Sequence, residues 1–401
     1  DVEGVVALAE KLHPDMVVVA PDDPLVLGMV DALQAKGFKT FGPKANAAII
    51  EGSKVFSKEL MKKYNIPTAG YEVFTDSESA IKYIKEQNSY PTVIKADGLA
   101  LGKGVILAQN EDEAVAAVHE MIDELKFGKS SARIVVEEFL TGPEVSVLSF
   151  TDGKTVVPMI SSMDHKRALD GDEGLNTGGM GTVAPNPYYT DDVAKQCMET
   201  IFKPTIEAMN AEGRTFEGCL YFGLMLTPKG PKVIEYNCRF GDPETQVVLP
   251  MLDADLCEIF EAIYDHKLAD IDIKWKSGSC TCVVMASGGY PLSYPKGLEI
   301  SGLNEMGQVD GAFVYHAGTK LADGKFLTNG GRVLGVTCTA LTLAEALKKS
   351  YAAVEKISWE NVHYRHDIGQ RALKADVDPL DLNYKDDMED YIESNGVYLR
   401  Q

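Results

Sequence analysis

The sequence PTVIKADGLALGKGV, residues 91–105, holds the pattern on which the fold prediction is built. An apolar run ending in Lys95 predicts a strand, and the glycine-rich turn after it places Lys103 between Gly102 and Gly104. Glycines let backbone N–H groups approach phosphate oxygens closely, and a lysine adds a point charge. The spacing differs from that of a Walker A loop. A phosphate-binding turn and a glycine-rich hairpin with solvated lysines both fit these residues.

A second stretch, VVEEFLTGPEVSV, covers residues 135–147 and predicts a strand that ends in two acids and an apolar pair. Such a connector can present backbone N–H and C=O groups to the edge of a purine, and a carboxylate can accept hydrogen bonds from ribose hydroxyls. A solvated acidic face fits the same residues. The candidate residues here are Glu137, Glu138, Phe139, Leu140 and Glu144.

A third stretch, KVIEYNCRFGDPET, covers residues 232–245. Glu235 and Asn237 lie two residues apart on a predicted strand, so their oxygens point to one face. Hard oxygen ligands suit Mg²⁺, which usually takes one or two protein carboxylates plus substrate phosphates. Arg239 would lie on the same face if the strand continues, and could fork onto a phosphate or carboxylate. A structural ion pair is the alternative.

Residues 161–189 contain many Gly, Asp, Asn and Pro and show no period, so we expect a long loop. Within it, DHKR at residues 164–167 and NTGGMG at residues 176–181 combine a basic cluster with a glycine hinge. This combination indicates either a mobile lid over an anion or a flexible surface loop. His165 could be an acid/base group, although a single histidine in a loop is more often solvated.

Elsewhere, apolar spacing predicts an α/β pattern that gives way to short strands and glycine-rich turns beyond residue 274. Helices are predicted over residues 5–12, 25–36, 45–64 (with a possible break at 52–53), 191–212, 256–262 and 343–356. Strands are predicted over residues 16–20, 38–41, 144–150, 155–160, 219–226, 232–236, 279–286, 314–317 and 332–339, with a loop at 21–24. From 71 to 136 strands and helices alternate.

The composition excludes several classes of protein. With 39 Lys and Arg against 60 Asp and Glu, the formal net charge is −21, which argues against a general nucleic-acid binder. A small anionic substrate needs only local positive charge, so it remains possible. No apolar run is long enough to span a membrane. Seven scattered cysteines show no zinc spacing, which favours reduced thiols and a cytoplasmic protein.

Together these motifs resemble the ATP-grasp superfamily, and more closely its phosphoribosylamine–glycine ligase family. The resemblance spans about residues 15–370. Its signatures are GSK at 52–54, IKADG at 94–98, GKGV at 102–105, VEEFL at 136–140, DHKR at 164–167, NTGGMG at 176–181, NCRFGDPET at 237–245, HAGTK at 316–320 and TNGGRV at 328–333.

The resemblance implies a multidomain α/β and α+β fold. A truncated Rossmann-like N-terminal domain would cover residues 1–48, and an ATP-grasp domain residues 49–270, with a lid subdomain near 65–140. A small β-rich domain would cover 271–375 and an acidic tail 376–401. The family begins with a strand and a glycine-rich turn ending in Arg-Glu-His, which are not found here, so we expect the natural chain to exceed 401 residues.

The resemblance also implies a reaction. ATP would phosphorylate glycine to glycyl phosphate, and the amine of 5-phosphoribosylamine would attack it, giving glycinamide ribonucleotide, ADP and phosphate. The implied ATP contacts are Lys54, Lys95, Gly102, Lys103, Gly104, Glu137, Glu138, Phe139, Leu140 and Glu144. The implied substrate contacts are Pro24, Asp164, Lys166, Arg167, Gly178, Gly179, Met180, Arg239, Asp242 and Arg332. The catalytic residues among these would be Arg239, Lys103, Asp164 and Lys166.

By the same resemblance Glu235 and Asn237 would hold Mg²⁺ or Mn²⁺, helped by the phosphates because residues 219–226 contain no acid. Neither nucleic acid nor membrane is an expected partner, and the protein would be a monomer or a homodimer. The alternatives are another ATP-grasp ligase, such as one that carboxylates an aminoimidazole ribonucleotide, and a nucleotide-sensing protein without turnover. The set of Lys103, Glu235, Asn237 and Arg239 favours an enzyme.

Overall fold

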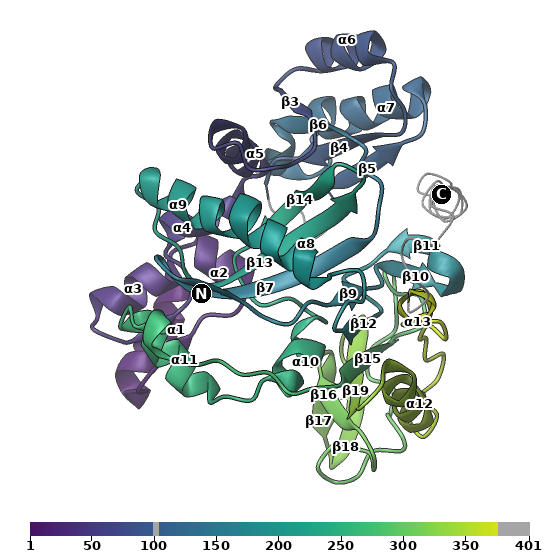
Figure 1. The fold of residues 1–401 in the computed structure, drawn as a ribbon. Coiled ribbons are helices and arrows are strands. Elements are labelled where there is room, and N and C mark those ends of the chain that lie inside the picture. Colours follow the sequence, from purple (N-terminus) through teal and green to yellow (C-terminus); the bar gives the residue numbers. More distant parts are fainter. Residues whose placement is uncertain (99–103, 376–401) are drawn as a thin grey trace.

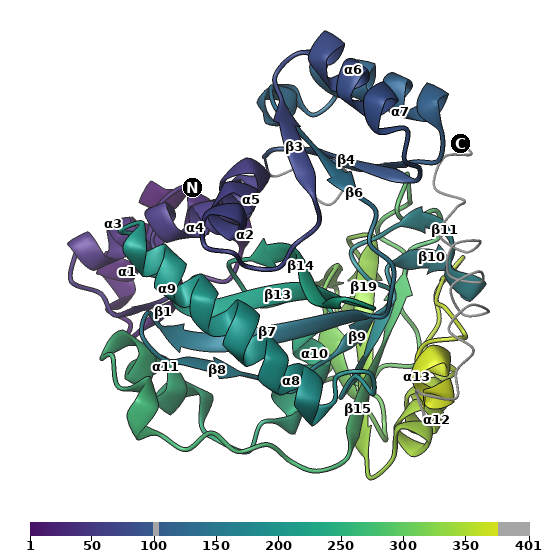
Figure 2. The same cartoon turned by 45° about the horizontal axis from the view of Figure 1, so that its top comes forward.

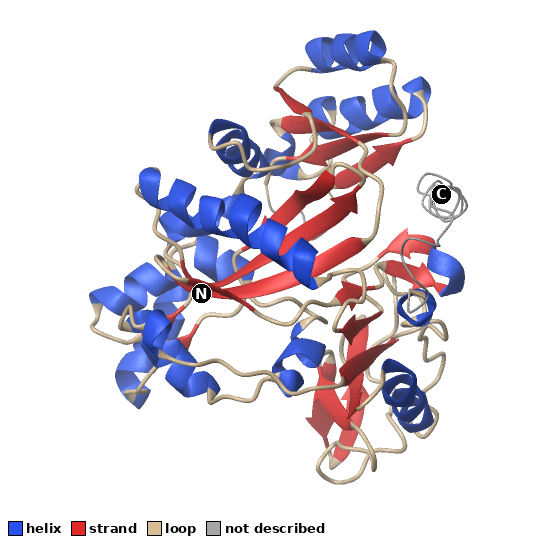
Figure 3. Ribbon diagram, viewed as in Figure 1, coloured by secondary structure: helices blue, strands red, loops and turns tan. Residues whose placement is uncertain are grey.

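The structure, a computed structural model, describes residues 1–98 and 104–375 (Figure 1). The predicted contacts Gly102 and Lys103 and the predicted acidic tail at 376–401 lie outside the described residues. Helices and strands are interspersed in the first third of the chain, strands follow one another over residues 134–184, and strands also dominate after residue 278 (Figure 3). None of the helices in the described ranges is both long enough and apolar enough to cross a bilayer.

The first segment has the expected α/β pattern with shorter elements. Its elements are α1 (Val2–Leu12), β1 (Val17–Val18), α2 (Asp22–Val26), α3 (Met29–Ala35), β2 (Thr40–Phe41) and α4 (Ala45–Gly52), and β1 pairs with β2 in parallel. The predicted helix over 25–36 is wrong in extent, because the chain breaks at Gly28, where φ is 84°. The predicted loop at 21–24 is also wrong, since α2 begins there with two acids in its first turn, where the helix dipole favours them.

The predicted break at Gly52–Ser53 is confirmed. Ser53 caps α5 (Lys54–Lys63) by accepting a hydrogen bond from the Phe56 N–H at 3.1 Å. The same hydroxyl donates to Oδ1 of Asp97 at 2.8 Å. The start of α5 is therefore fixed to the end of the strand that precedes the glycine-rich turn.

An outer sheet contains β3 (Tyr71–Phe74), β4 (Thr92–Ala96), β5 (Val105–Ala108) and β6 (Ile134–Glu138) in the order β3-β6-β4-β5, all antiparallel. Helices α6 (Ser77–Gln87) and α7 (Glu111–Val118) cover the face turned away from the rest of the molecule (Figure 2). Ile94 and Val136 point into that apolar layer, so the residues that alternate with them face inward.

A central sheet contains β7 (Glu144–Asp152), β8 (Val156–Pro158), β13 (Glu217–Thr227) and β14 (Gly230–Asn237) in the order β14-β13-β7-β8. One face packs under a continuous helical segment made of α8 (Asp191–Cys197), a π-helical turn (Met198–Phe202) and α9 (Lys203–Ala211) (Figure 2). The opposite face packs against α10 (Thr245–Val248) and α11 (Leu256–Tyr264). Apart from α10, which was not predicted, these strands and helices match the prediction.

A third sheet has the order β16-β19-β15-β12-β9. Its strands β15 (Ser279–Ala286), β16 (Phe313–His316) and β19 (Arg332–Ala340) were predicted, as was α12 (Leu343–Val354). A hairpin of β17 (Thr319–Ala322) and β18 (Lys325–Thr328) and a short helix α13 (Gln370–Lys374) complete this region.

The predicted long loop over 161–189 is wrong. This stretch forms β9 (Met163–Asp164), β10 (Arg167–Leu169), β11 (Glu173–Asn176) and β12 (Gly181–Ala184). Strands β9 and β12 join the third sheet, where Gly181 pairs with Val283 about a hundred residues later. Strands of two to four residues are too short to show a sequence period, so whether they form depends on pairing with other strands.

One turn of the central sheet gives a stability prediction. Gly142, just before β7, has φ 140°, and a Cβ there would lie 2.0 Å from the Leu226 carbonyl oxygen. We expect Gly142→Ala to lower the free energy of unfolding by about 3 kcal/mol, because strain and a backbone clash add. Gly213→Ala is the control, since Gly213 has φ 68° but no atom within 4 Å of its Cβ position. The free energy of unfolding of Gly213→Ala, measured in urea, should fall by about 1 kcal/mol. Equal losses in Gly142→Ala and Gly213→Ala would contradict the clash.

Candidate active site

A buried group of charges lies on the inner face of the outer sheet. Glu137, on β6, is 4% exposed, and its Oε2 lies 3.1 Å from Nζ of Lys95 and 3.0 Å from Nζ of Lys58. Burial lowers the pKa of Lys58 to about 8, against the raising effect of Glu137. The second oxygen of Glu137 is buried and accepts no hydrogen bond from the described residues. Two lysine ammonium groups share this one carboxylate, and the positive charge that remains suits an anionic ligand.

Lys54 joins this group from the first turn of α5. Its Nζ donates to the Gly98 carbonyl at 3.0 Å, and burial lowers the pKa of its ammonium. Asp97 fixes the start of α5 beside the end of β4. Its carboxylate accepts from the Val55 N–H at 2.9 Å and from Nε of Arg133 at 3.0 Å. The predicted ATP contacts Lys54, Lys95 and Glu137 are therefore close together.

The other predicted nucleotide contacts surround this group. Glu138, on the opposite face of β6, is exposed and accepts from the Gly70 N–H at 2.9 Å. Leu140 is buried against Ala69 and Met225, which shapes an apolar floor. The Gly104 carbonyl accepts from the Ala96 N–H at 2.8 Å.

Glu235 and Asn237 lie on one face of β14, as predicted. In the central sheet Gly223 stands opposite Glu235 and Tyr221 opposite Asn237. Glu235 is 39% exposed at the surface of the site. Burial raises its pKa, but Lys166, Lys95 and Lys54 outweigh burial and leave the pKa below its ordinary value. Glu235 is therefore an ionised carboxylate.

Lys166 links two acids of this face. Its Nζ lies 3.6 Å from Glu144 and 4.0 Å from Glu235. The Glu144 carboxylate raises the pKa of Lys166 well above its ordinary value, with Glu235 adding to the effect. Burial, with the nearby Glu244 carboxylate, raises the pKa of Asp164 well above its ordinary value. The site thus combines a lysine whose pKa is raised with a carboxyl group whose pKa is also raised.

Arg332 connects the third sheet to the glycine segment. Its Nη1 donates to the Gly178 carbonyl at 2.8 Å and to the Asp242 carbonyl at 2.7 Å, and its Nη2 pairs with Oδ2 of Asp242 at 2.9 Å. A Cβ at Gly179 would lie 2.6 Å from Oδ1 of Asp164. Four predicted substrate contacts, Gly178, Gly179, Asp242 and Arg332, are therefore brought together with Asp164.

Arg239 lies where β14 ends. Its Nη2 is 3.4 Å from Oε1 of Glu51, and its Nη1 donates to the Phe240 carbonyl at 3.2 Å. Burial lowers the pKa of Arg239, but Glu51 and Asp22 outweigh burial and raise it. Pro24 is half-buried within α2, the helix that also contains Asp22.

Three predicted site residues point into the protein. The Met180 side chain is fully buried in the core of the third sheet, so only its backbone could meet a ligand. Arg167 is 3% exposed and donates to the Gly174 carbonyl. His165 is 1% exposed; its Nδ1 donates to the Gly181 carbonyl and its Nε2 accepts from the Gly369 N–H, both at 3.0 Å. The expectation of a solvated His165 is wrong.

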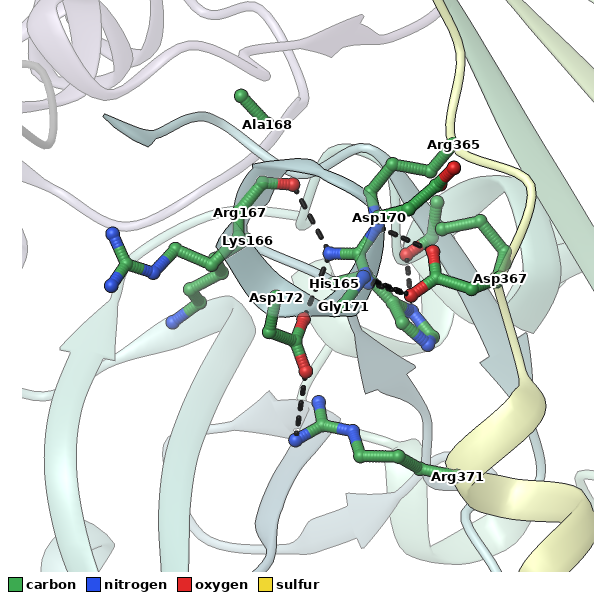
Figure 4. A network of polar contacts seen from close by, with 12 residues as sticks. His165, Lys166, Arg167, Ala168, Asp170, Gly171, Asp172, Arg365, Asp367 and Arg371 are labelled. Carbon is green, nitrogen blue, oxygen red and sulfur yellow. Dashed lines mark hydrogen bonds and ion pairs between the residues drawn. The ribbon is translucent and has the colours of Figure 1, made fainter. Parts of the chain in front are cut away.

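A buried ion network fixes the segment that contains Lys166 (Figure 4). Arg365, whose side chain is 0% exposed, pairs with Asp172 at 2.8 Å and with Asp367 at 2.7 Å, and donates to the Arg167 carbonyl at 3.1 Å. Arg371 reaches Asp172 from α13 at 3.3 Å. His363 and His366 belong to this network too, because His363 donates to the Ala168 carbonyl and His366 pairs with Asp170.

The sequence analysis missed three residues of this arrangement: Lys58, Glu51 and Arg365. Lys58 could have been found, because it lies four residues after Lys54 and shares its helix face. Glu51 and Arg365 have no such signal, since their partners come from distant parts of the chain.

The donor set fits a divalent cation that relies on phosphates. Within the described ranges, no three His, Cys, Asp or Glu side chains gather closely enough to hold a metal. Asn237 donates its Nδ2 to Glu51 at 3.0 Å, which leaves its Oδ1 as an acceptor beside the ionised Glu235. One carboxylate and one amide oxygen suit Mg²⁺ when phosphate oxygens and water supply the remaining ligands.

Comparison with known proteins decides the family. Models of phosphoribosylglycinamide synthetase match three consecutive parts of the chain: the N domain matches residues 1–51, the ATP-grasp (A) domain 52–245 and the C domain 280–371. The chain belongs to the phosphoribosylamine–glycine ligase family. The ligase of Escherichia coli is 48% identical over 94% of this chain and 88% of its own length. That of Clostridium acetobutylicum is 46% identical, over 92% and 87%.

Solved structures agree on the fold of this ligase family member. The crystal structure of phosphoribosylamine–glycine ligase from Thermotoga maritima has a TM-score of 0.80 and 34% identity, and covers 90% of this chain and 88% of that one. The biotin carboxylase domain of the Hydrogenobacter thermophilus 2-oxoglutarate carboxylase, solved with MgADP, has a TM-score of 0.73 over 98% of this chain and 84% of its own. At 18% identity it shows the shared fold alone.

The buried His165 gives a pH prediction. Burial, with Arg371 and Arg365 nearby, lowers the pKa of His165 to about 4 from an ordinary value of 6.5. As the pH falls from 6.5 to 4, His165 becomes protonated in the unfolded chain but stays neutral in the folded protein. The free energy of unfolding therefore decreases in this range. Relative to His165→Gln, the wild type should lose up to about 1.4 kcal/mol per pH unit in this window, measured by urea unfolding. The prediction would be contradicted if the free energies of unfolding of the wild type and His165→Gln changed in parallel with pH.

Proposed function

We propose that this protein is an ATP-dependent ligase that joins glycine to 5-phosphoribosylamine through glycyl phosphate, giving glycinamide ribonucleotide, ADP and phosphate in purine biosynthesis. The observation that carries the proposal is the ionised Glu235, surrounded by Lys54, Lys95 and Lys166, in a chain of this family. Phosphoryl transfer depends mainly on positioning and on charge neutralisation, which such an arrangement supplies.

In this proposal the ATP phosphates lie against Lys54, Lys95 and the turn that contains Gly102, Lys103 and Gly104. The purine lies against the connector at 137–140, over the apolar floor that Leu140 forms. Glu144 accepts from the ribose. The second oxygen of Glu137, which accepts no hydrogen bond within the part of the chain that the structure describes, offers a buried acceptor beside this space.

Glycine and its acyl phosphate would lie near Arg239, Asp164 and Lys166. Lys166 binds anionic oxygens as a permanent cation. Gly178 and Gly179, held by Arg332, exclude water from the reactive intermediate, with Asp242 fixing Arg332. Pro24 and Arg332 would meet the phosphoribosyl group, whereas the buried Arg167 and the backbone at Met180 would support the glycine side.

Glu235 and Asn237 would hold Mg²⁺ or Mn²⁺, which when bound neutralises charge on the phosphates. The Hydrogenobacter thermophilus carboxylase domain, which shares the fold, was solved with MgADP, and this supports a divalent cation beside the nucleotide. We also propose a monomer or homodimer in the cytoplasm, without nucleic-acid or membrane partners. Reduced thiols there agree with the seven free cysteines.

We propose domain limits at 48/49, 270/271 and 375/376, with a lid subdomain near 65–140. The ranges matched by the three family models, 1–51, 52–245 and 280–371, support the division. Strands β9 and β12 pass from the second part into the sheet of the third.

A coupled assay for ADP tests the function. ADP release by the wild type should require glycine and 5-phosphoribosylamine together. Release that depends on bicarbonate and an aminoimidazole ribonucleotide would instead assign a carboxylating ATP-grasp enzyme, and nucleotide binding without release would assign a sensor. The family comparisons favour the ligase.

Glu235→Ala tests the centre of the site. Without this carboxylate the cation loses the charged protein ligand proposed for it, so ADP formation should fall by about 100-fold or more while the protein stays folded. Glu207→Ala, an exposed change on α9, is the control and should keep wild-type turnover. Wild-type turnover in Glu235→Ala, with an unchanged circular dichroism spectrum, would remove Glu235 from the metal site.

A further inference from the structure

One carboxylate outside the predicted site, that of Glu51 at the end of α4, meets three donors from the last residue of β14 and the two residues after it. Its Oε1 accepts from Nδ2 of Asn237 at 3.0 Å and lies 3.4 Å from Nη2 of Arg239. Its Oε2 accepts from the backbone N–H of Cys238 at 2.7 Å. The side chain is 5% exposed, and a buried carboxylate needs such partners.

These contacts fix which end of the Asn237 amide faces the site. An asparagine side chain has one acceptor oxygen and one donor nitrogen, whereas an ionised carboxylate can only accept. Because Glu51 accepts from Nδ2, the oxygen Oδ1 is turned the other way. Oδ1 is the only side-chain atom of Asn237 that can bind a cation.

We propose that Glu51 is a positioning residue that holds Asn237 with Oδ1 toward the metal and keeps Arg239 beside it. The inference rests on the proposed function for the roles of Asn237 and Arg239. The N-domain model matches residues 1–51. With Glu51 in this role, that region helps to build the catalytic site. Residues that hydrogen-bond to a metal ligand commonly orient that ligand.

Glu51→Gln tests the proposal without changing the side-chain shape. The backbone donor of Cys238 takes the glutamine oxygen, which turns the glutamine NH₂ toward the NH₂ of Asn237. Asn237 then rotates and presents its nitrogen to the metal. We expect Mn²⁺ affinity in the presence of ADP, measured by electron paramagnetic resonance, to fall about 10-fold to 100-fold, with a similar fall in kcat. The KM for ATP should change much less.

The double variant Glu51→Gln/Asn237→Asp should recover most of the Mn²⁺ affinity. The introduced aspartate accepts from the glutamine NH₂ and keeps a second oxygen for the cation, so the hydrogen bond is restored in the reverse direction. Glu207→Gln is the matched control, since Glu207 is exposed on α9, and it should bind Mn²⁺ like the wild type.

Unchanged Mn²⁺ affinity in Glu51→Gln would overturn the proposal, as would a folded double variant that recovers none of it. Failure of both variants to fold, judged by melting temperature and circular dichroism, would assign Glu51 a purely structural role and also overturn it. The proposed function fails separately: wild-type ADP release that ignores glycine refutes the ligase reaction, while the Mn²⁺ measurements still decide the role of Glu51.

Discussion

The carboxylate of Glu137 joins the outer sheet to the central sheet, and the site depends on this junction. From Glu137 one path runs through Lys95 to the Ile234 carbonyl, and another through Lys58 and Thr68 to the Val233 carbonyl. Both paths end on β14, next to Glu235. Removing either lysine would leave a buried charge only partly compensated, which is costly. The same ions that attach the outer sheet therefore place positive charge beside Glu235 on β14.

The remaining site residues arrive from two other directions. The ion network of Arg365 fixes the segment that contains Lys166 from the carboxyl-terminal side, and Arg332 fixes the glycine segment from the third sheet. Glu51 approaches from the amino-terminal side. Each contact joins parts of the chain that are far apart in sequence. The candidate site therefore takes residues from the regions matched by all three family models, and no one region contains it.

This arrangement explains how a chain with a net charge of −21 can bind anions. Lys54, Lys95 and Lys166 act on the site at short range, and there the local charge outweighs the charge of the whole protein. The low pKa of Glu235 is a direct consequence, since these lysines outweigh the effect of burial. Many of the acids that give the chain its net charge are exposed, such as Glu78, Glu86 and Glu111, and solvent and salt screen them.

The sequence by itself determined the family, the central strands and the side-by-side placement of Glu235 and Asn237, because a strand alternates its faces with a period of two. It also determined the break before Lys54, since Gly52 and Ser53 act through local geometry. Only the tertiary structure decided that residues 161–189 form strands, that His165 and Met180 are buried, and that Glu51 and Arg365 support the site. Those outcomes depend on partners up to about two hundred residues away, and no local pattern encodes such pairings.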